Sequence, residues 1–337
     1  MTVGMLIPMG YRGYLLMSVN TAITTSVSSR KPFKDRTRQL WKNIKKNKYR
    51  YVLVFPGLVW FIIFKYVPYS GLLMAFQNFS VRKGIFGSPW VGLDNFRYVF
   101  SSTDFMNMVR NTLIIGGMNI LFYFPLPIIV AVMISEVRHS KFKRITQSTI
   151  YLPHFLSWVI VYALTFFLLS VDVGLVNKAL TSLGMERISF LTNKTAFYII
   201  ITCQTIWRET GWGTILFLAA IAGINQELYE AAAIDGAGRL RQIWHVTLPG
   251  IKMTIVTMLI LRVGRVADVS LEQVLLIQNP LIQSVSEVFD TYAYNYGIIQ
   301  GLTSIGTAVS AFKSVVNLVF VLTADFVCKR LGEDGIF

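Results

Sequence analysis

The sequence Glu-Ala-Ala-Ala-Ile-Asp-Gly-Ala occupies residues 230–237 and is followed by Leu248-Pro249, inside a polar interval at residues 223–252. Long apolar runs flank this interval on both sides. Its consecutive alanines favour a helix, and Gly236 and Gly238 can adopt backbone angles that other residues avoid. The pattern predicts two short helices hinged at these glycines, between two long apolar segments. On these residues alone, an ordinary helical hairpin is the alternative interpretation.

The composition places this interval in a membrane protein. The chain of 337 residues is 54% hydrophobic and only 15% charged, whereas an average soluble domain has about 25% charged residues. A bilayer core of about 30 Å is crossed by roughly 20 apolar residues in a helix. Several runs reach that length, so we expect an all-α polytopic membrane protein. Its six transmembrane helices are predicted at residues 51–76, 113–134, 149–169, 196–221, 253–276 and 305–327.

Local signals refine these spans and the segments between them. Pro125 and Pro127 each remove a backbone donor inside the second span, which predicts a kink. Apolar residues recur at helical spacing after Asp94, which predicts a short amphipathic helix on the outer face. A second short helix is expected over residues 175–183, ended by Gly184.

The distribution of charge orients the spans. The net charge is +15, and ten Lys or Arg residues against one acid lie between Arg30 and Arg50. The positive-inside rule places this segment, the loop 136–146, the interval 223–252 and both termini in the cytoplasm. We therefore expect a basic, partly disordered cytoplasmic segment at residues 1–50 and a six-helix transmembrane domain at residues 51–330. This distribution disfavours nucleic-acid binding.

The spacing of the interval resembles a known motif. Glu230-Ala231-Ala232, then Gly236, Val246 and Leu248-Pro249 resemble the EAA loop of type I ABC importer permeases, which usually have Ile at the position of Val246. The run 229–238 is most similar to the sugar-importer branch of the maltose type. The resemblance implies that this loop is a coupling helix that docks on an ATP-hydrolysing subunit. The residues assigned to it are Glu230, Ala231, Ala232, Asp235, Gly236, Ala237, Leu248 and Pro249.

Further motifs resemble a narrower branch that serves oligosaccharides and polysaccharide fragments. They lie at residues 65–68, 76–77, 91–96, 272–275 and 279–281. Asp325 stands where this branch is expected to have Asn, and the first 30 residues have no match. The resemblance implies a permease domain over residues 51–330, in the bacterial cytoplasmic (inner) membrane.

The chain has no G-x-x-x-x-G-K-[ST] motif, so we expect a transport subunit rather than an enzyme. The resemblance implies a second homologous permease, a dimer of ATP-binding subunits that holds ATP and Mg, an extracytoplasmic solute-binding protein, an oligosaccharide substrate and membrane lipid. No catalytic residue, metal site or cofactor of its own is predicted. The scattered histidines, His154 among them, are interpreted as solvated or packed.

Charged and aromatic residues in and after the fourth and fifth spans could line a solute pathway. At roughly 100° per residue, the charged residues from Arg262 to Glu272 would share one helix face. Ionisable groups at membrane depth usually face a bundle interior or a wet cavity. A structural ion-pair network is the alternative, as is a membrane-interface belt for the tyrosines. The predicted pathway residues are Trp207, Arg208, Glu209, Trp212, Arg262, Arg265, Asp268, Glu272, Gln273, Tyr292, Tyr294 and Tyr296.

Arg262 and Arg265 suit carboxylate-bearing sugars by bidentate pairing, which favours an acidic, uronate-rich fragment of the alginate type. A permease of the same family for neutral oligosaccharides is one alternative. An ion-coupled secondary transporter is another, but it should show inverted repeats, which are not evident. A membrane enzyme acting on lipid-linked sugars would need a carboxylate or histidine cluster at an interface.

Overall fold

Helices make up the regular structure of the computed structural model, which describes residues 45–333, 335 and 336. An isolated bridge pairs Gln77 with Trp90. The chain divides into two compact units, residues 1–67 and 68–337. The predicted disorder of the basic N-terminal segment falls largely on residues outside the described ones.

The described part of the first unit is helical throughout. Helix α2 (Lys48–Phe61) leads into the π-helical turn η1 (Ile62–Tyr66), and α2 has no buried residue. The helix runs on through η2 (Val67–Phe76), and residues 48–76 are long and apolar enough to cross a membrane. This element corresponds to the first predicted span.

The second unit opens with two short helices, α3 (Gly84–Gly87) and α4 (Asp94–Ser101). Helix α4 is the amphipathic helix predicted after Asp94, and Val99 is its buried residue. A continuous helix of 31 residues follows, formed by α5 (Phe105–Met118), η3 (Asn119–Tyr123) and α6 (Pro125–Ser135). Pro125 stands at the first position of α6, where its missing N–H costs little, and a π-helical turn precedes it where a kink is predicted.

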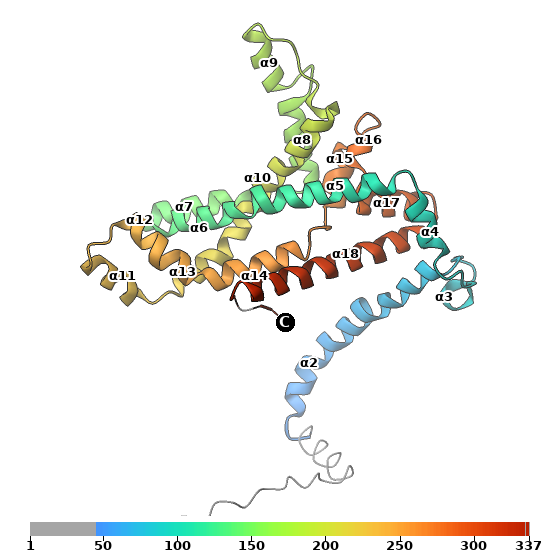
Figure 1. Ribbon diagram of the computed structural model, residues 1–337, viewed down its shortest axis with the longest axis horizontal. Coiled ribbons are helices and arrows are strands. Elements are labelled where there is room, and N and C mark those ends of the chain that lie inside the picture. The colour runs from blue at the N-terminus through green and yellow to red at the C-terminus, as the bar shows by residue number, and fades with distance from the viewer. Residues whose placement is uncertain (1–44, 334, 337) are drawn as a thin grey trace, which may run out of the picture. The chain divides into compact units, whose positions relative to one another are not determined.

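The third predicted span is not one helix, which corrects the prediction for residues 149–169. Helix α7 (Ser140–Tyr151) and the short η4 (Leu152–Phe155) meet α8 (Trp158–Leu169) at a bend of 98°. Pro153 cannot donate to the preceding turn, and the Ser157 hydroxyl accepts a hydrogen bond from the Ile160 amide, which starts a new helix. In Figure 1, α8 and α9 project away from the helices α5 to α7.

After the bend the chain turns back. Helix α9 (Leu175–Ser182) ends before Gly184, whose φ of 78° gives the predicted stop. The turn η5 (Phe190–Thr192) leads to α10 (Lys194–Ala222), a helix of 29 residues capped by Asn193. The polar interval then forms α11 (Gln226–Ile234), α12 (Arg239–Gln242), η6 (Ile243–Thr247) and α13 (Leu248–Gly250).

The fifth predicted span is also broken, so the prediction of one helix over residues 253–276 is wrong. Helix α14 (Lys252–Val263) ends at Gly264, and α15 (Leu271–Ile277) begins after Ser270, which caps it. At Gly264 a Cβ would lie 2.7 Å from Cβ of Val321. Close packing therefore excludes a side chain where the helix stops, and the shared face expected for the charges from Arg262 to Glu272 does not form.

The chain closes with α16 (Gln283–Ser286), α17 (Phe289–Tyr294), η7 (Asn295–Ile299) and the 28-residue α18 (Thr303–Arg330). Within the described residues, three helices are long and apolar enough to cross a membrane, or up to five if each of two bent pairs counts as one span. The second pair joins residues 239–250 to α14 at 60°. Six spans remain a prediction.

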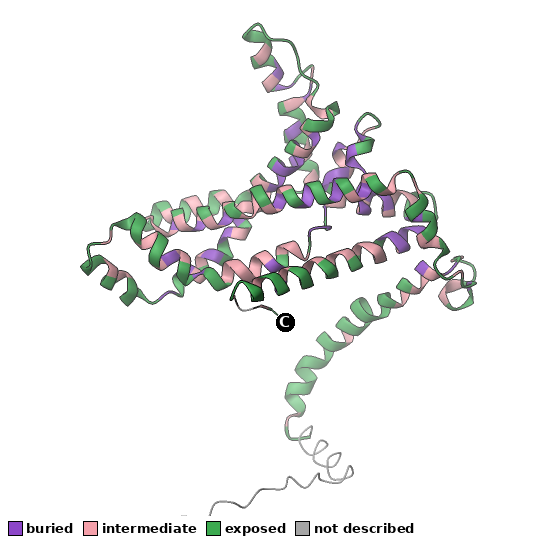
Figure 2. Ribbon diagram, in the orientation of Figure 1, coloured by how far each residue is buried: buried purple, intermediate pink, exposed green. Residues whose placement is uncertain are grey.

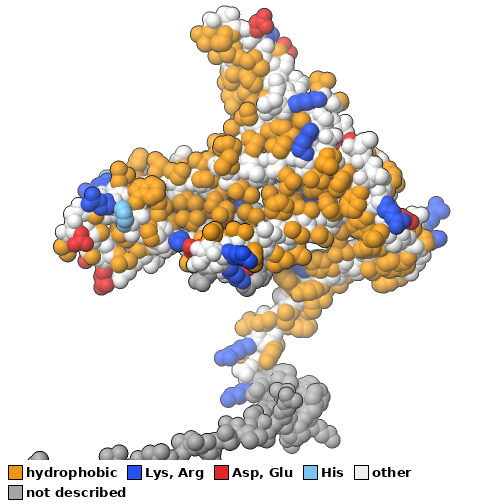
Figure 3. Space-filling view, in the orientation of Figure 1, with side chains coloured by type: hydrophobic (Ala, Val, Ile, Leu, Met, Phe, Trp, Pro, Cys, Tyr) orange, Lys and Arg blue, Asp and Glu red, His pale blue; other side chains and the backbone are white. Residues whose placement is uncertain are grey.

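Burial in the second unit concentrates where helices meet (Figure 2). One cluster joins Ile115, Ile201 and Val274 from α5, α10 and α15. Asn111 reinforces it, because its amide donates to the carbonyls of Ser284 and Glu287 at 3.0 and 2.9 Å and accepts from the Tyr198 hydroxyl at 2.7 Å. Hydrophobic side chains cover much of the flank seen in Figure 3, as expected of a surface that faces lipid.

Candidate coupling loop and polar pathway

The interval that follows α10 has the predicted form of two short helices. The Asn225 side chain accepts from the Glu227 amide at 3.1 Å and caps α11, while the acidic Glu227 lies at the positive end of the helix dipole. Gly236 has φ of 75°, which lets the Ala237 amide reach the Ala232 carbonyl at 2.8 Å and end the helix.

Contacts at its base brace this hairpin. The Tyr229 hydroxyl lies 3.0 Å from the Thr247 hydroxyl, and the Gln242 amide donates to the Ala237 carbonyl at 3.1 Å. A Cβ on Gly250 would lie 2.7 Å from a methyl group of Ile224, so the start and end of the loop are in close contact. These contacts hold the start and the end of the loop together.

The tip of the hairpin exposes apolar side chains beside the predicted acid. Glu230 is exposed and makes no ion pair within the described residues. Ile234, Leu240 and Trp244 are 87%, 75% and 67% exposed. The loop residues predicted from the motif did not include these three, although apolar residues in a polar loop are a visible signal. Such side chains around a charge suit a protein-binding surface better than open water.

A polar cluster forms around the middle of α10. A Glu209 carboxylate oxygen lies 2.9 Å from Nδ1 of His154, and the other oxygen pairs with the Arg208 guanidinium. The Arg208 Nε donates to the Leu156 carbonyl at 2.9 Å. The prediction joined Arg208 and Glu209 in one site but interpreted His154 as merely packed or solvated. The structure places His154 in direct contact with both the charge pair and an aromatic ring.

Aromatic rings complete this cluster. The His154 ring stacks on Trp212 with centroids 4.6 Å apart, and the Arg208 guanidinium lies 4.5 Å from the Trp158 ring centre. The Arg262 guanidinium lies 4.9 Å from the Tyr123 ring, and the Tyr123 hydroxyl donates to the Glu209 carbonyl at 3.4 Å. Arg262 has no carboxylate within ion-pair distance among the described residues. The cluster therefore holds two guanidinium groups and one carboxylate.

Asp268 belongs to a second cluster, at the break between α14 and α15. Lys313 of α18 lies 2.9 Å from Asp268 and 2.8 Å from Asp290. Asn317, one turn further along α18, donates to Asp268 at 3.0 Å and accepts from the Ala267 amide at 3.0 Å. The sequence prediction omitted Lys313 and Asn317, and their spacing of four residues is the signal that could have indicated them.

The remaining predicted pathway residues do not form one site with the two clusters. Gln273 is buried, and its amide donates to the Ile201 carbonyl at 3.0 Å and to Gln204 at 3.1 Å. Tyr292 is buried and stacks on Tyr296 with centroids 4.0 Å apart, and burial raises the pKa of Tyr292 to about 12. Tyr294 is half-buried. Arg265 and Glu272 are exposed, with no ion pair in the described part of the chain.

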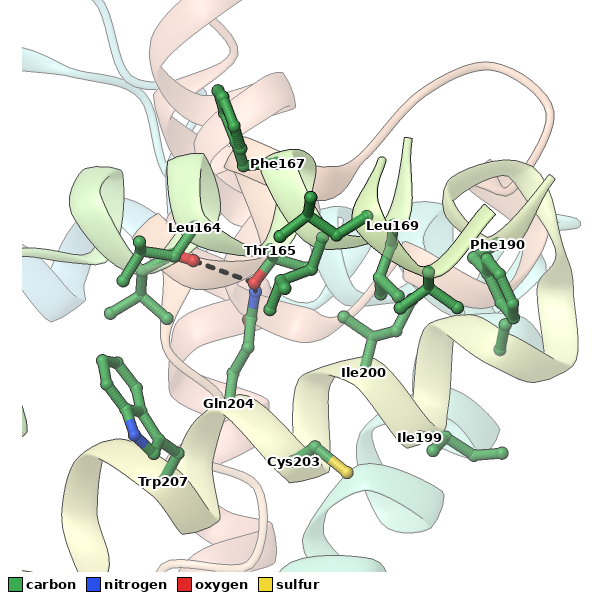
Figure 4. A pocket seen from close by; sticks show the side chains of 15 residues that line it. Leu164, Thr165, Phe167, Leu169, Phe190, Ile199, Ile200, Cys203, Gln204 and Trp207 are labelled. Carbon is green, nitrogen blue, oxygen red and sulfur yellow. Dashed lines mark hydrogen bonds between the residues drawn. The ribbon is translucent and has the colours of Figure 1, made fainter. Parts of the chain in front are cut away.

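Trp207 lies in another environment. It lines an apolar groove of about 750 Å³ between α8, α9 and α10, together with Cys203 and Phe190. Figure 4 shows Trp207 at one end and Phe190 at the other, with the Gln204 amide donating to the Thr165 hydroxyl at 2.7 Å across the groove. The lining is almost entirely hydrocarbon, so the groove suits an apolar surface rather than a sugar.

The apolar helices, the exposed hairpin and the charged residues between the helices describe a helical membrane protein. The chain belongs to the family of binding-protein-dependent transport system inner membrane components, whose sequence pattern matches residues 123–333. This match confirms the predicted family resemblance and the expectation of a transport subunit rather than an enzyme.

Three similar proteins narrow the branch. Protein LplB of Bacillus subtilis is 48% identical, with 87% of this chain and 92% of that protein aligned. The polygalacturonan/rhamnogalacturonan transport system permease protein YteP of the same organism is 45% identical, with 90% of this chain and 95% of that protein aligned. The third is a chain from the crystal structure of a bacterial ABC transporter involved in the import of the acidic polysaccharide alginate. It is 39% identical, with a TM-score of 0.80, and the alignment covers 88% of this chain and 100% of that chain.

Proposed function

We propose that this chain is one membrane subunit of an ATP-driven importer of acidic oligosaccharides. The observation that carries the substrate class is the position of Arg262, whose guanidinium lies over the Tyr123 ring with no carboxylate within ion-pair distance among the described residues, while Glu209 is already paired with Arg208. An uncompensated cation at membrane depth is costly, and an anionic solute would compensate it. The polygalacturonan and alginate transporters to which the chain is similar support the same class.

The proposed topology is six spans with both termini in the cytoplasm of a bacterium, in its inner membrane. Helix α10 supports the fourth predicted span, because its 29 residues are long enough to cross a bilayer. Its polar residues lower its mean hydropathy, so hydropathy alone does not indicate this span. Its Arg208 and Glu209 pair with each other and with neighbouring helices, as charges inside a bundle do. The basic N-terminal segment and the loop 136–146 supply the positive-inside signal.

The mechanism we propose is alternating access. A dimer of ATP-binding subunits, which holds ATP and Mg, would bind the hairpin 223–252. Glu230 would be the charged contact of the hairpin, and its apolar contacts would be Ile234, Leu240 and Trp244. A second, homologous permease would complete the membrane part. An extracytoplasmic solute-binding protein would deliver the sugar, a partner supported by the similar alginate transporter structure solved with an alginate pentasaccharide-bound periplasmic protein.

Arg262 tests the proposed substrate class. The Arg262→Gln variant of the assembled transporter should take up a uronic-acid oligosaccharide about tenfold more slowly, which is the scale of one lost charge-assisted interaction. Uptake of the carboxyl-reduced form of the same oligosaccharide should change little. Arg97→Gln, which removes an exposed ion pair with Asp94, is the matched control.

Two results would contradict the proposal. Equal losses for the acidic and the reduced oligosaccharide would favour the alternative of a permease for neutral oligosaccharides. Uptake that continues in proteoliposomes without ATP, driven by an imposed ion gradient, would favour a secondary transporter.

A further inference from the structure

The bend in the third span is held at four successive points by one stretch of α10. A Cβ on Gly211 would lie 2.0 Å from the Ile150 carbonyl oxygen, so α10 touches the end of α7 directly. Glu209 then binds His154 in η4 at 2.9 Å. Arg208 binds the Leu156 carbonyl at 2.9 Å and covers the ring of Trp158, the first residue of α8.

These contacts satisfy the backbone where the helix is interrupted. A break at membrane depth frees carbonyl and amide groups, and such a break is stable only if protein groups bind them. The Leu156 carbonyl is one such group, and its partner is the guanidinium that Glu209 orients from the other side. Arg208 and Glu209 of α10 are therefore already engaged by the bend, whereas Arg262 is not.

Helix α10 also leads directly to the hairpin. It ends at Ala222, and α11 begins four residues later at Gln226. The close contact of Gly250 with Ile224 braces the hairpin at this junction. One continuous helix therefore connects the hairpin to the residues that hold the bend.

From this arrangement we propose that Arg208, Glu209 and His154 are positioning residues that transmit movement of the hairpin to the bend between α7 and α8. The proposal rests on the proposed ATP-driven mechanism. Movement of α10 would shift the bend and the start of α8 with it, because Glu209 and Arg208 contact residues on both sides of the bend. The hydrogen bond from the Gln204 amide to the Thr165 hydroxyl is a further link between α10 and α8.

The test measures coupling in the complete transporter, with its solute-binding protein, in proteoliposomes. In Arg208→Gln the ratio of solute taken up to ATP hydrolysed should fall about tenfold, the scale of one charge-assisted hydrogen bond, with the KM for solute unchanged. His154→Phe keeps an aromatic ring on Trp212 but loses the hydrogen bond to Glu209, so its ratio of solute taken up to ATP hydrolysed should also fall. Arg208→Lys keeps the charge and should restore part of the ratio. Arg187→Gln, which removes an exposed pair with Asp172, is the control.

A second measurement does not depend on transport. Spin labels at Ser148 in α7 and Lys178 in α9, both exposed, report the distance across the bend after Cys203 and Cys328 are replaced by serine. We expect one narrow distance distribution in the parent and a broad one in Arg208→Gln. An unchanged distribution, or a raised KM with an unchanged ratio, would overturn the proposal. Absence of ATP-dependent uptake in the parent would instead contradict the proposed function.

Discussion

Two neighbouring glycines in α5 offer a matched test of how closely the segment between α14 and α15 packs against α5. A Cβ on Gly116 would lie 2.3 Å from the Val266 carbonyl oxygen and 2.6 Å from a Val266 methyl group. A Cβ on Gly117 would meet nothing within 4 Å. Alanine at either position gains up to about 1 kcal/mol of helix propensity, so the two substitutions differ in the steric term alone.

Real Cβ contacts stay beyond 3.0 Å, so Gly116→Ala requires α5 and residue 266 to separate by at least 0.7 Å. Overpacking of this kind costs roughly 1–3 kcal/mol, and more where a backbone carbonyl cannot turn away. After the propensity gain is subtracted, we expect Gly116→Ala to be less stable than the parent by up to about 2 kcal/mol, and less stable than Gly117→Ala by about 1–3 kcal/mol. Gly117→Ala should be equal to the parent or slightly more stable.

The assay is thermal unfolding of the detergent-purified protein, followed by tryptophan fluorescence and by loss of the monodisperse peak in size-exclusion chromatography. Denaturant titration of both variants converts the shift into a free energy of unfolding. Equal stability of Gly116→Ala and Gly117→Ala would refute the close approach of residue 266 to α5, and with it the packing of this break.

Two further predictions concern the hairpin and the polar segment after α15. Trp244→Ser should weaken association with the ATP-binding subunits by at least about tenfold in a pull-down, because an exposed aromatic ring of this kind is typical of an interface hot spot; normal association would contradict the proposed docking surface. Burial raises the pKa of Glu287 above its ordinary value, so its stabilising contribution is present below that value and is lost as pH rises through the folded-state pKa. Glu287→Gln mimics the protonated form, and its melting temperature relative to the parent should therefore increase between pH 4.5 and 7.5; a constant difference would contradict the assignment.

Much of the fold follows from local sequence signals. The apolar runs place the long helices, and Gly236 and Gly184 end short helices as expected because each has a positive φ that few other residues adopt. The hairpin could be predicted in form because its determinants are local. Its exposed apolar residues, Ile234, Leu240 and Trp244, do not follow from the motif, because the motif does not indicate which side chains are exposed.

The two broken spans could not be predicted in the same way. Hydrophobicity alone favours an unbroken helix, and Pro153 near the start of a span is compatible with either outcome. A helix can break at these positions because polar side chains from distant parts of the chain form hydrogen bonds with the freed backbone groups. Arg208 of α10 binds the Leu156 carbonyl, and Asn317 of α18 binds the Ala267 amide. Both partners lie about 50 residues away in sequence, so no local pattern reports them.

The breaks also separate charges that one helix would have kept together. Because α14 ends at Gly264, Arg262 lies beside Tyr123 of the second span, while Asp268 lies beside Lys313 of the last. Each break is held by a continuous helix through an ion pair: Arg208 with Glu209 at one, Lys313 with Asp268 at the other. Those charges have partners within the protein. Arg262 has no carboxylate within ion-pair distance among the described residues, so the cation best placed to bind a solute carboxylate is distinct from the charges that hold the bends.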